Sequence, residues 1–301
     1  MNNPQNSSAV LVAGATGHLG GEICRQLIEE NKQVKGLVRT SSDVNKISQL
    51  EQLGVKTVFG DLKDKASLQT ALQGVYAVIS TVSSTLSRQT GDTIQTVDDE
   101  GQINLIDAAV AAGVNYFVFI SFSPMPGEFA LQTAKRKVEE HLTRSGLNYT
   151  ILQPTCFMEI WLGPAVGFDY VNGKATIFGE GKNRLSWIAI KDVASFAVAA
   201  LDNPAARNRI FELGGPAALS QLEVVNIFET KQGKKFELTF VPEDALMTQL
   251  AEEGDWLSKT FAALMLGVAH GSEIEMTGTL KVFPIQLTNV NQYAEKVSTY
   301  A

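Results

Sequence analysis

The segment from Val10 to Gly20, VLVAGATGHLG, constrains the fold of this chain more than any other. An apolar run typical of a buried strand leads directly into a turn with glycines at Gly14, Gly17 and Gly20, and a helical apolar pattern follows. In such a turn the first glycine permits a tight bend, the second lets the backbone approach a pyrophosphate, and the third lets the helix pack on the strand. The segment therefore predicts a dinucleotide site at a helix start, a plain glycine-rich turn being the alternative.

The end of the next strand indicates which dinucleotide is bound. An NAD-binding unit places an acidic residue there, about 20 residues after the glycines, to bind the ribose 2′-hydroxyl. Here the strand Val34–Val38 ends in Arg39, followed by Thr40. Because a guanidinium pairs with a 2′-phosphate through two hydrogen bonds, Arg39 favours NADP(H), unless it is an ordinary surface arginine. Lys46 is a candidate for a second positive charge.

Composition limits the partners and the compartment. The chain has 301 residues, of which 45% are hydrophobic and 19% charged, and a net charge of −7, so a nucleic acid is not expected as its main ligand. The N-terminal MNNPQNSS lacks the pattern of a signal peptide, and the apolar runs are too short to span a membrane. Cys24 and Cys156 form no metal or redox motif, and His18, His141 and His270 stand apart from any triad or metal pattern. We therefore expect a cytoplasmic protein without a bound metal.

Strands and helices alternate after the glycine turn. We expect strands at Val55–Phe59, Ala77–Val82, Tyr116–Ser121 and Tyr149–Leu152, and helices at Val44–Leu53, Ser67–Gln73, Asp98–Ala112 and Leu131–Ser145. Each helix ends near a glycine, namely Gly54, Gly74, Gly113 and Gly146, as helix C-termini commonly do. This pattern predicts an α/β fold of the Rossmann type, a doubly wound parallel sheet covered by helices on both faces.

The regular alternation of strands and helices ends past Pro154. A strand-like Leu185–Ile190, a helix Asp192–Leu201 and a strand Ile210–Leu213 follow. We expect residues 9–154 to form the NAD(P)-binding Rossmann domain, and residues 155–301 to form a smaller substrate-binding region that partly extends the Rossmann sheet.

Several segments resemble the NmrA-like and isoflavone-reductase-like group of atypical short-chain dehydrogenases. They are GATGHLGGEICRQL, LVRTSS, VFGDLKD, VDDEGQINLIDAAVAAGVNYFVFIS, AIKDVASFAVAAL and FELGGP, and the resemblance extends from Val10 to about Val241. The segment GLNYTILQPTCF resembles the group's sixth strand and nicotinamide-facing loop, with Gln153 where many relatives carry arginine.

The pattern and the resemblance together assign candidate cofactor residues. Asp61 is placed to accept a hydrogen bond from the adenine, with Leu62 against the ring, although Asp61 would equally serve as a helix cap. Small and hydroxylated residues at the carboxyl edge of the sheet would let a ribose approach closely. The predicted cofactor-binding residues are Gly14, Thr16, Gly17, His18, Leu19, Gly20, Arg39, Thr40, Asp61, Leu62, Thr81, Val82, Ser83, Ser121, Lys135, Pro154, Cys156 and Phe157.

The candidate catalytic residue is Lys135. Short-chain dehydrogenases usually carry Tyr-x-x-x-Lys on the fifth helix, whereas this chain has Leu131 at the tyrosine position and keeps the lysine. Relatives that resemble isoflavone reductase also lack the tyrosine, which implies that Lys135 holds the nicotinamide ribose and acts as general acid, directly or through water. A solvated lysine in the basic run 135–137 is the alternative. The missing tyrosine disfavours a sugar-nucleotide epimerase.

An apolar set borders the expected nicotinamide position. Candidates for substrate contact are Phe122, Met125, Met158 and Trp161, with core packing as the alternative role for each. The sequence thus predicts an NADPH-dependent oxidoreductase that reduces a small planar substrate, aromatic, quinone-like or enone-like. The alternative is a non-catalytic NADP(H) sensor of the NmrA type, which would contact a protein partner.

Overall fold

A computed structural model describes residues 9–86, 89–252 and 254–299. The chain divides into two compact units. The first comprises residues 1–121, 131–153 and 193–211, and the second comprises residues 122–130, 154–192 and 212–301. Each unit is built from segments that are distant in the sequence, whereas the sequence suggested one boundary after Pro154.

The first unit is organised around a seven-stranded sheet. Its strands lie in the order β10-β6-β5-β4-β1-β2-β3. They are β1 (Ala9–Ala13), β2 (Val34–Val38), β3 (Lys56–Phe59), β4 (Val75–Ser80), β5 (Tyr116–Ile120), β6 (Asn148–Pro154) and β10 (Arg209–Leu213). The pairs from β6 through β3 are all parallel. This order confirms the predicted doubly wound Rossmann-type fold, and β10 extends the sheet beside β6 as expected.

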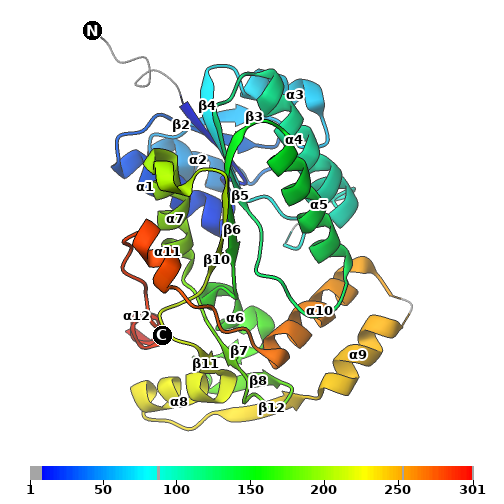
Figure 1. The fold of residues 1–301 in the computed structure, drawn as a ribbon. Helices are drawn as coiled ribbons and strands as arrows, with labels where there is room; N and C mark the ends of the chain where they lie inside the picture. Colours follow the sequence, from blue (N-terminus) through cyan, green and yellow to red (C-terminus); the bar gives the residue numbers. More distant parts are fainter. Residues whose placement is uncertain (1–8, 87–88, 253, 300–301) are drawn as a thin grey trace. The chain divides into compact units, whose positions relative to one another are not determined.

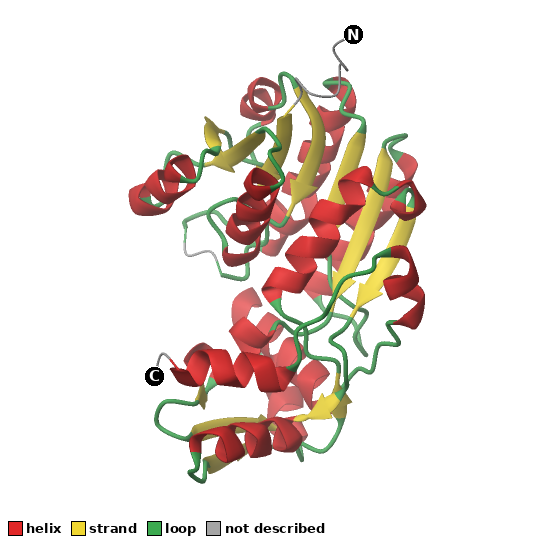
Figure 2. Cartoon of the chain, turned by 90° about the vertical axis from the view of Figure 1, so that its left-hand side faces the viewer, coloured by secondary structure: helices red, strands yellow, loops and turns green. Residues whose placement is uncertain are grey.

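Helices cover both faces of this sheet, as Figures 1 and 2 show. One face carries α1 (His18–Glu29), α2 (Val44–Gln52) and α7 (Ile190–Asp202), and the other carries α3 (Lys65–Ala71), α4 (Glu100–Ala111) and α5 (Ala130–Arg144). A short helical turn, η4 (Pro204–Ala206), follows α7. Apolar side chains of β1, β4, β5 and the helices α3 to α5 form the core between the sheet and this second face.

The helix ends follow the local sequence signals. Gly54, Gly74, Gly113 and Gly146, expected as helix stops, all have φ between 69° and 92°, in the left-handed region that glycine adopts without strain. These four positions explain why the predicted ends of α2 to α5 lie within two residues of the observed ones.

One helix begins differently from the prediction. The sequence suggested a single helix from Asp98, but a π-helical segment, η2 (Ile94–Asp99), precedes α4. Thr93 caps this segment in a reciprocal capping box with Thr96. Asp98 therefore lies on a segment of wider helical spacing, a feature that often occurs at functional sites.

The second unit contains two small sheets and several helices. The strands are β7 (Phe168–Asp169), β8 (Lys174–Phe178), β9 (Arg184–Leu185), β11 (Leu219–Ser220) and β12 (Glu237–Val241). The helices are α6 (Met158–Trp161), η3 (Pro164–Val166), α8 (Gln221–Gln232), α9 (Glu243–Ala251), α10 (Trp256–His270), α11 (Thr277–Val282) and α12 (Val290–Thr299). The central β8 pairs in parallel with β12 and antiparallel with β7.

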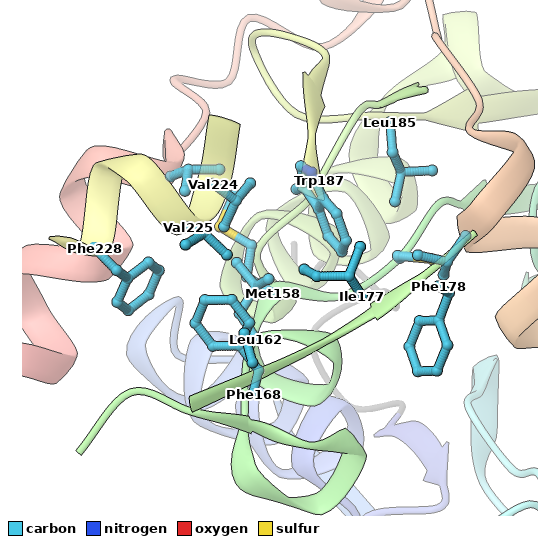
Figure 3. Packing of buried hydrophobic residues seen from close by; sticks show 14 of the residues in the cluster. Met158, Leu162, Phe168, Ile177, Phe178, Leu185, Trp187, Val224, Val225 and Phe228 are labelled. Carbon is cyan, nitrogen blue, oxygen red and sulfur yellow. The ribbon is translucent and has the colours of Figure 1, made fainter. Parts of the chain in front are cut away.

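A separate aromatic-rich core holds the second unit together (Figure 3). Phe168 packs edge-on against Phe228, with ring centroids 4.9 Å apart. Within the expected strand Leu185–Ile190, only Leu185 belongs to a strand, β9, and Ile190 is already the first residue of α7. No helix in the described part of the chain is long and apolar enough to cross a membrane.

Candidate functional site

The glycine turn between β1 and α1 is tightly packed. Gly14 has φ +85°, and a Cβ there would lie 2.5 Å from Thr81 Oγ1. A Cβ at Gly20 would lie 2.1 Å from the Gly14 carbonyl oxygen, which no real contact allows. A Cβ at Gly17 would meet the same oxygen at 3.2 Å, with φ −82° in the ordinary range. The first and third glycines are thus required by the fold, whereas Gly17 is under a much weaker packing constraint.

The start of α1 fits an anionic ligand. Gly17 is the N-cap residue and offers no capping side chain, and the first turn contains no acidic residue. The first N–H groups of a helix carry partial positive charge and need acceptors, which a pyrophosphate supplies. Thr16 lies in the turn before the cap residue, and His18 and Leu19 are the first two residues of α1.

The end of β4 lies against the same turn. Thr81 donates from both its backbone N and its Oγ1 to the Ala13 carbonyl, at 3.0 and 3.1 Å. The Val82 carbonyl accepts a hydrogen bond from Gln102 Nε2 at 2.9 Å, and the hydroxyl oxygens of Ser83 and Thr85 lie 3.2 Å apart. The small residues 81–83 therefore lie at the carboxyl edge of the sheet, next to Gly14, where open α/β sheets bind ligands.

Arg39 lies at the end of β2 and pairs with a carboxylate. Its Nη1 donates to Asp92 Oδ2 at 2.5 Å, and Lys63 Nζ pairs with Asp92 Oδ1. Thr40 is exposed beside Arg39. The sequence suggested Lys46 as a candidate second positive charge, which stays a prediction; in the structure Lys63 shares the Asp92 carboxylate with Arg39.

Asp61 and Leu62 follow β3. Asp61 Oδ1 accepts from the Lys63 backbone N at 2.9 Å, while the cap of α3 is Asp64, whose side chain accepts from Ala66 N. Asp61 is therefore not the helix cap, as the alternative held, because the cap lies three residues later at Asp64. Leu62 is buried in the core, where a Cβ added to Gly101 would lie 2.9 Å from its Cβ.

Lys135 is buried in the first unit, with 4% of the residue exposed. Its Nζ lies 3.6 Å from Asp98 Oδ1, 3.4 Å from the Val82 carbonyl oxygen and 5.0 Å from the centroid of the Phe119 ring. Burial lowers the pKa of Lys135, and the nearby Asp98 carboxylate partly opposes this effect. The alternative of a solvated lysine is therefore wrong, because the rest of the helix is amphipathic and turns this position inward.

Asp98 is the acidic partner of Lys135. It is fully buried, and its Oδ2 accepts from Ser84 N at 2.9 Å and from Ser84 Oγ at 2.5 Å. Its Oδ1 receives no hydrogen bond from any residue in the described ranges and faces the Lys135 ammonium. A buried acceptor without a hydrogen-bond donor is rare, and here the ion pair with Lys135 supplies the compensating charge.

Three other positions singled out in the sequence lie on α5, directly after β5 and on β6. Leu131, which replaces the usual tyrosine, is buried one helical turn before it. Ser121 Oγ accepts a long hydrogen bond of 3.4 Å from Arg136 Nη2. Gln153 Nε2 donates to Glu139 Oε1 at 2.9 Å, so the glutamine has a defined buried partner in this chain.

The remaining candidates belong to the second unit. Cys156 is buried, and burial raises its pKa to about 12. Met158 is fully buried in the aromatic-rich core (Figure 3), which is a packing role. Pro154 ends β6, and Phe157 precedes α6.

The aromatic candidates of the second unit lie in two places. Phe122 stacks on Phe129 at 6.0 Å, and Met125 lies against Gly267 of α10. Trp161 packs edge-on against Phe178 and lines a small pocket together with residues that include Phe168, Thr176 and Trp187.

Fold and site define a Rossmann-type α/β protein with a glycine turn before its first helix and a buried lysine at the carboxyl edge of its sheet. Comparison with known proteins then assigns the family: the chain belongs to the NmrA-like family, whose profile matches residues 6–293. This agrees with the resemblance found in the sequence.

Individual relatives have different activities. The chain is 32% identical over 237 residues to the photosystem II assembly factor Ycf39 of Synechocystis sp., covering 77% of this chain and 70% of the relative. It is 32% identical over 229 residues to an NAD(P)H azoreductase of Xenophilus azovorans, covering 75% and 74%. Among solved structures, the NADPH-dependent quinone oxidoreductase of Escherichia coli, in complex with NADPH, matches with a TM-score of 0.76 at 23% identity, covering 96% of this chain and 99% of the other.

Sequence reasoning missed Asp98, Asp92 and Lys63. Asp98 was expected only as the first residue of a helix, and its partner Lys135 lies 37 positions further along the chain. Lys63 carried a usable signal, because it follows β3 and β3 is the neighbour of the strand that ends at Arg39. No local pattern indicates Asp92.

Proposed function

We propose that this protein is an NADPH-dependent reductase that transfers a hydride to a small planar substrate. The observation that carries this proposal is the buried Lys135 ammonium, held between the Asp98 carboxylate and the Val82 carbonyl at the carboxyl edge of the sheet. An ammonium buried among so few hydrogen-bond partners is costly, and perturbed lysines of this kind concentrate at functional sites.

The chain's own residues account for cofactor binding. The N–H groups at the start of α1 would hold the pyrophosphate, Gly17 would let it approach, and Arg39 would pair with the 2′-phosphate. NADPH, when bound, supplies the hydride. Lys135 would hold the nicotinamide ribose and carry the proton that the reduced substrate requires at its heteroatom.

The Asp98 carboxylate is a positioning residue in this proposal. It accepts two hydrogen bonds from Ser84 on one oxygen, which fixes its orientation, and turns the other oxygen to Lys135 Nζ. Its negative charge raises the pKa of Lys135 and so opposes the larger, lowering effect of burial. A protonated Lys135 can then release a proton from Nζ, directly or through a water molecule.

A planar, electrophilic substrate suits this arrangement. With Leu131 in place of tyrosine, the helix lacks the phenol that ordinary alcohol and ketone interconversion uses. The azoreductase relative and the quinone oxidoreductase of the same fold are both named for planar acceptors, which supports the same class here.

The test is NADPH oxidation by the purified protein with a panel of quinones, azo dyes, flavonoid-like enones and aryl aldehydes. We expect turnover with at least one planar acceptor, faster with NADPH than with NADH. The absence of turnover with every compound, in protein that binds NADPH, would contradict the proposal.

A second candidate is a non-catalytic NADP(H)-binding protein that contacts a protein partner. The observation in its favour is the similarity to Ycf39, a relative named as an assembly factor. This candidate also predicts NADPH binding but gives no role to the proton of Lys135. NADPH binding without reduction of any acceptor, together with NADPH-dependent retention of a partner, would favour it.

A further inference from the structure

Asp92 forms a buried junction between two cations. Its side chain is 2% exposed, and each carboxylate oxygen pairs with a different cation, Oδ2 with Arg39 Nη1 and Oδ1 with Lys63 Nζ. The side chains of Arg39 and Lys63 are each 31% exposed. The carboxylate is therefore covered, while both cations keep a face open to solvent.

The two cations come from neighbouring strand ends. Arg39 directly follows β2, and Lys63 follows β3 by a short turn; in the sheet Val38 is paired with Phe59. Parallel strands end at the same edge, so the fold itself brings the two side chains together. Lys63 lies 3.4 Å from Asp61 Oδ2 as well, so the cluster as a whole is close to neutral.

We propose that Arg39 and Lys63 together form a site for a phosphate monoester, the 2′-phosphate of NADPH, and that Asp92 is an internal counter-ion which limits the affinity of this site. The inference rests on the proposed function in taking NADPH as the cofactor. It goes further in assigning a second phosphate-binding cation and a residue that opposes binding.

The geometry of Asp92 supports a shared anion site. Two oxygens of one carboxylate contact both cations, so a phosphate, whose oxygens have similar spacing, is able to contact both in the same way. The charge of Asp92 repels a dianionic phosphate held by the same cations, and the partial burial weakens solvent screening of this repulsion. Removing the Asp92 charge should therefore strengthen binding of NADPH more than binding of NADH.

The experiment is a fluorescence titration of the purified full chain with NADPH and with NADH. The variants are Lys63→Met and Asp92→Asn, with Lys65→Met and Asp64→Asn as matched controls that make the same charge changes at exposed positions nearby. Asn at residue 64 keeps the cap of α3. Thermal unfolding of each apoprotein reports whether the fold is intact.

We expect Lys63→Met to weaken NADPH binding about tenfold, the lower end for hydrogen bonds to charged groups, with NADH affinity unchanged. Asp92→Asn should tighten NADPH binding about threefold to tenfold, as for one partly screened charge pair. Both effects should shrink at high salt, and neither control should change the ratio of the two affinities.

An unchanged ratio in Lys63→Met would overturn the two-cation site. Selective weakening of NADPH binding in a folded Asp92→Asn variant would overturn the counter-ion role. Should Asp92→Asn not fold, Asp92→Ser takes its place, because it also removes the charge and must not weaken NADPH binding selectively if Asp92 opposes the phosphate. Binding with these ratios but without turnover would refute the proposed reduction and leave this inference standing.

Discussion

Single residues at this site act through partners that are distant in the sequence. Lys135 would be an ordinary lysine of an amphipathic helix without burial and without Asp98. The resemblance to the Tyr-x-x-x-Lys pattern of short-chain dehydrogenases singled out Lys135, four residues after Leu131. Its pairing with Asp98, and that of Arg39 with Asp92, were not, because each pair joins segments that only the folded sheet brings together.

The first residue-scale prediction concerns Arg39. Arg39→Ala removes a charged donor from the expected 2′-phosphate site, so NADPH affinity should fall by about 1.5–3 kcal/mol, the range for hydrogen bonds to charged groups. NADH affinity should stay nearly the same. Titration of both cofactors measures this, and equal NADPH and NADH affinities in the parent protein would refute it.

The second residue-scale prediction is a pH dependence. The acid is the protonated Lys135, whose pKa lies below its usual value, so kcat should fall as pH rises through that lowered pKa. Besides Asp98, the charges facing Lys135 are Glu139, which raises its pKa, and Arg136, which lowers it. Asp98→Asn removes a charge that raises the pKa, so the fall in kcat should move to lower pH.

Asp99→Asn is the matched control for this pH profile. Asp99 is the neighbouring carboxylate, but it pairs with Lys137 Nζ at 2.7 Å rather than with Lys135. The control should keep the parent profile. A profile that stays in place in Asp98→Asn would mean that Asp98 does not set the protonation of Lys135.

At the scale of elements, the glycine turn was predictable and the π-helical segment was not. The glycine spacing correctly predicted the tight packing at Gly14 and Gly20, because both residues lie within one short strand–turn–helix segment. The segment η2 depends on the Thr93 cap and on the close approach of Gly101 to Leu62, which are contacts that periodicity does not encode.

The element-scale prediction contrasts two glycines of that turn. Gly17→Val places a side chain where the pyrophosphate must approach, so NADPH binding should be lost with a small decrease in unfolding temperature. Gly20→Val should instead destabilise the fold, since even its Cβ would overlap the Gly14 carbonyl. NADPH titration and thermal unfolding of both variants separate the two effects; parent-like NADPH affinity in Gly17→Val would place the cofactor elsewhere.

At the scale of the whole molecule, the chain combines a Rossmann unit with a second unit that has its own aromatic core. The doubly wound sheet was predictable because every strand and helix carries a local signal. The division into units was less predictable, because residues 122–130 belong to the second unit and residues 193–211 to the first, each against its order in the sequence. The proposed substrate class therefore depends on the chemistry of the Lys135 site and not on the shape of a substrate pocket.

The most direct test of the account is the turnover of Lys135→Met at saturating NADPH with the best acceptor from the panel. Loss of the proton donor should lower kcat by about 10²–10⁴-fold, the usual contribution of a positioned general acid, and weaken NADPH binding modestly. Leu131→Met, a change of similar volume on the same helix face, is the control and should retain most of the activity. A Lys135→Met protein that reduces the acceptor as fast as the parent would contradict the central claim.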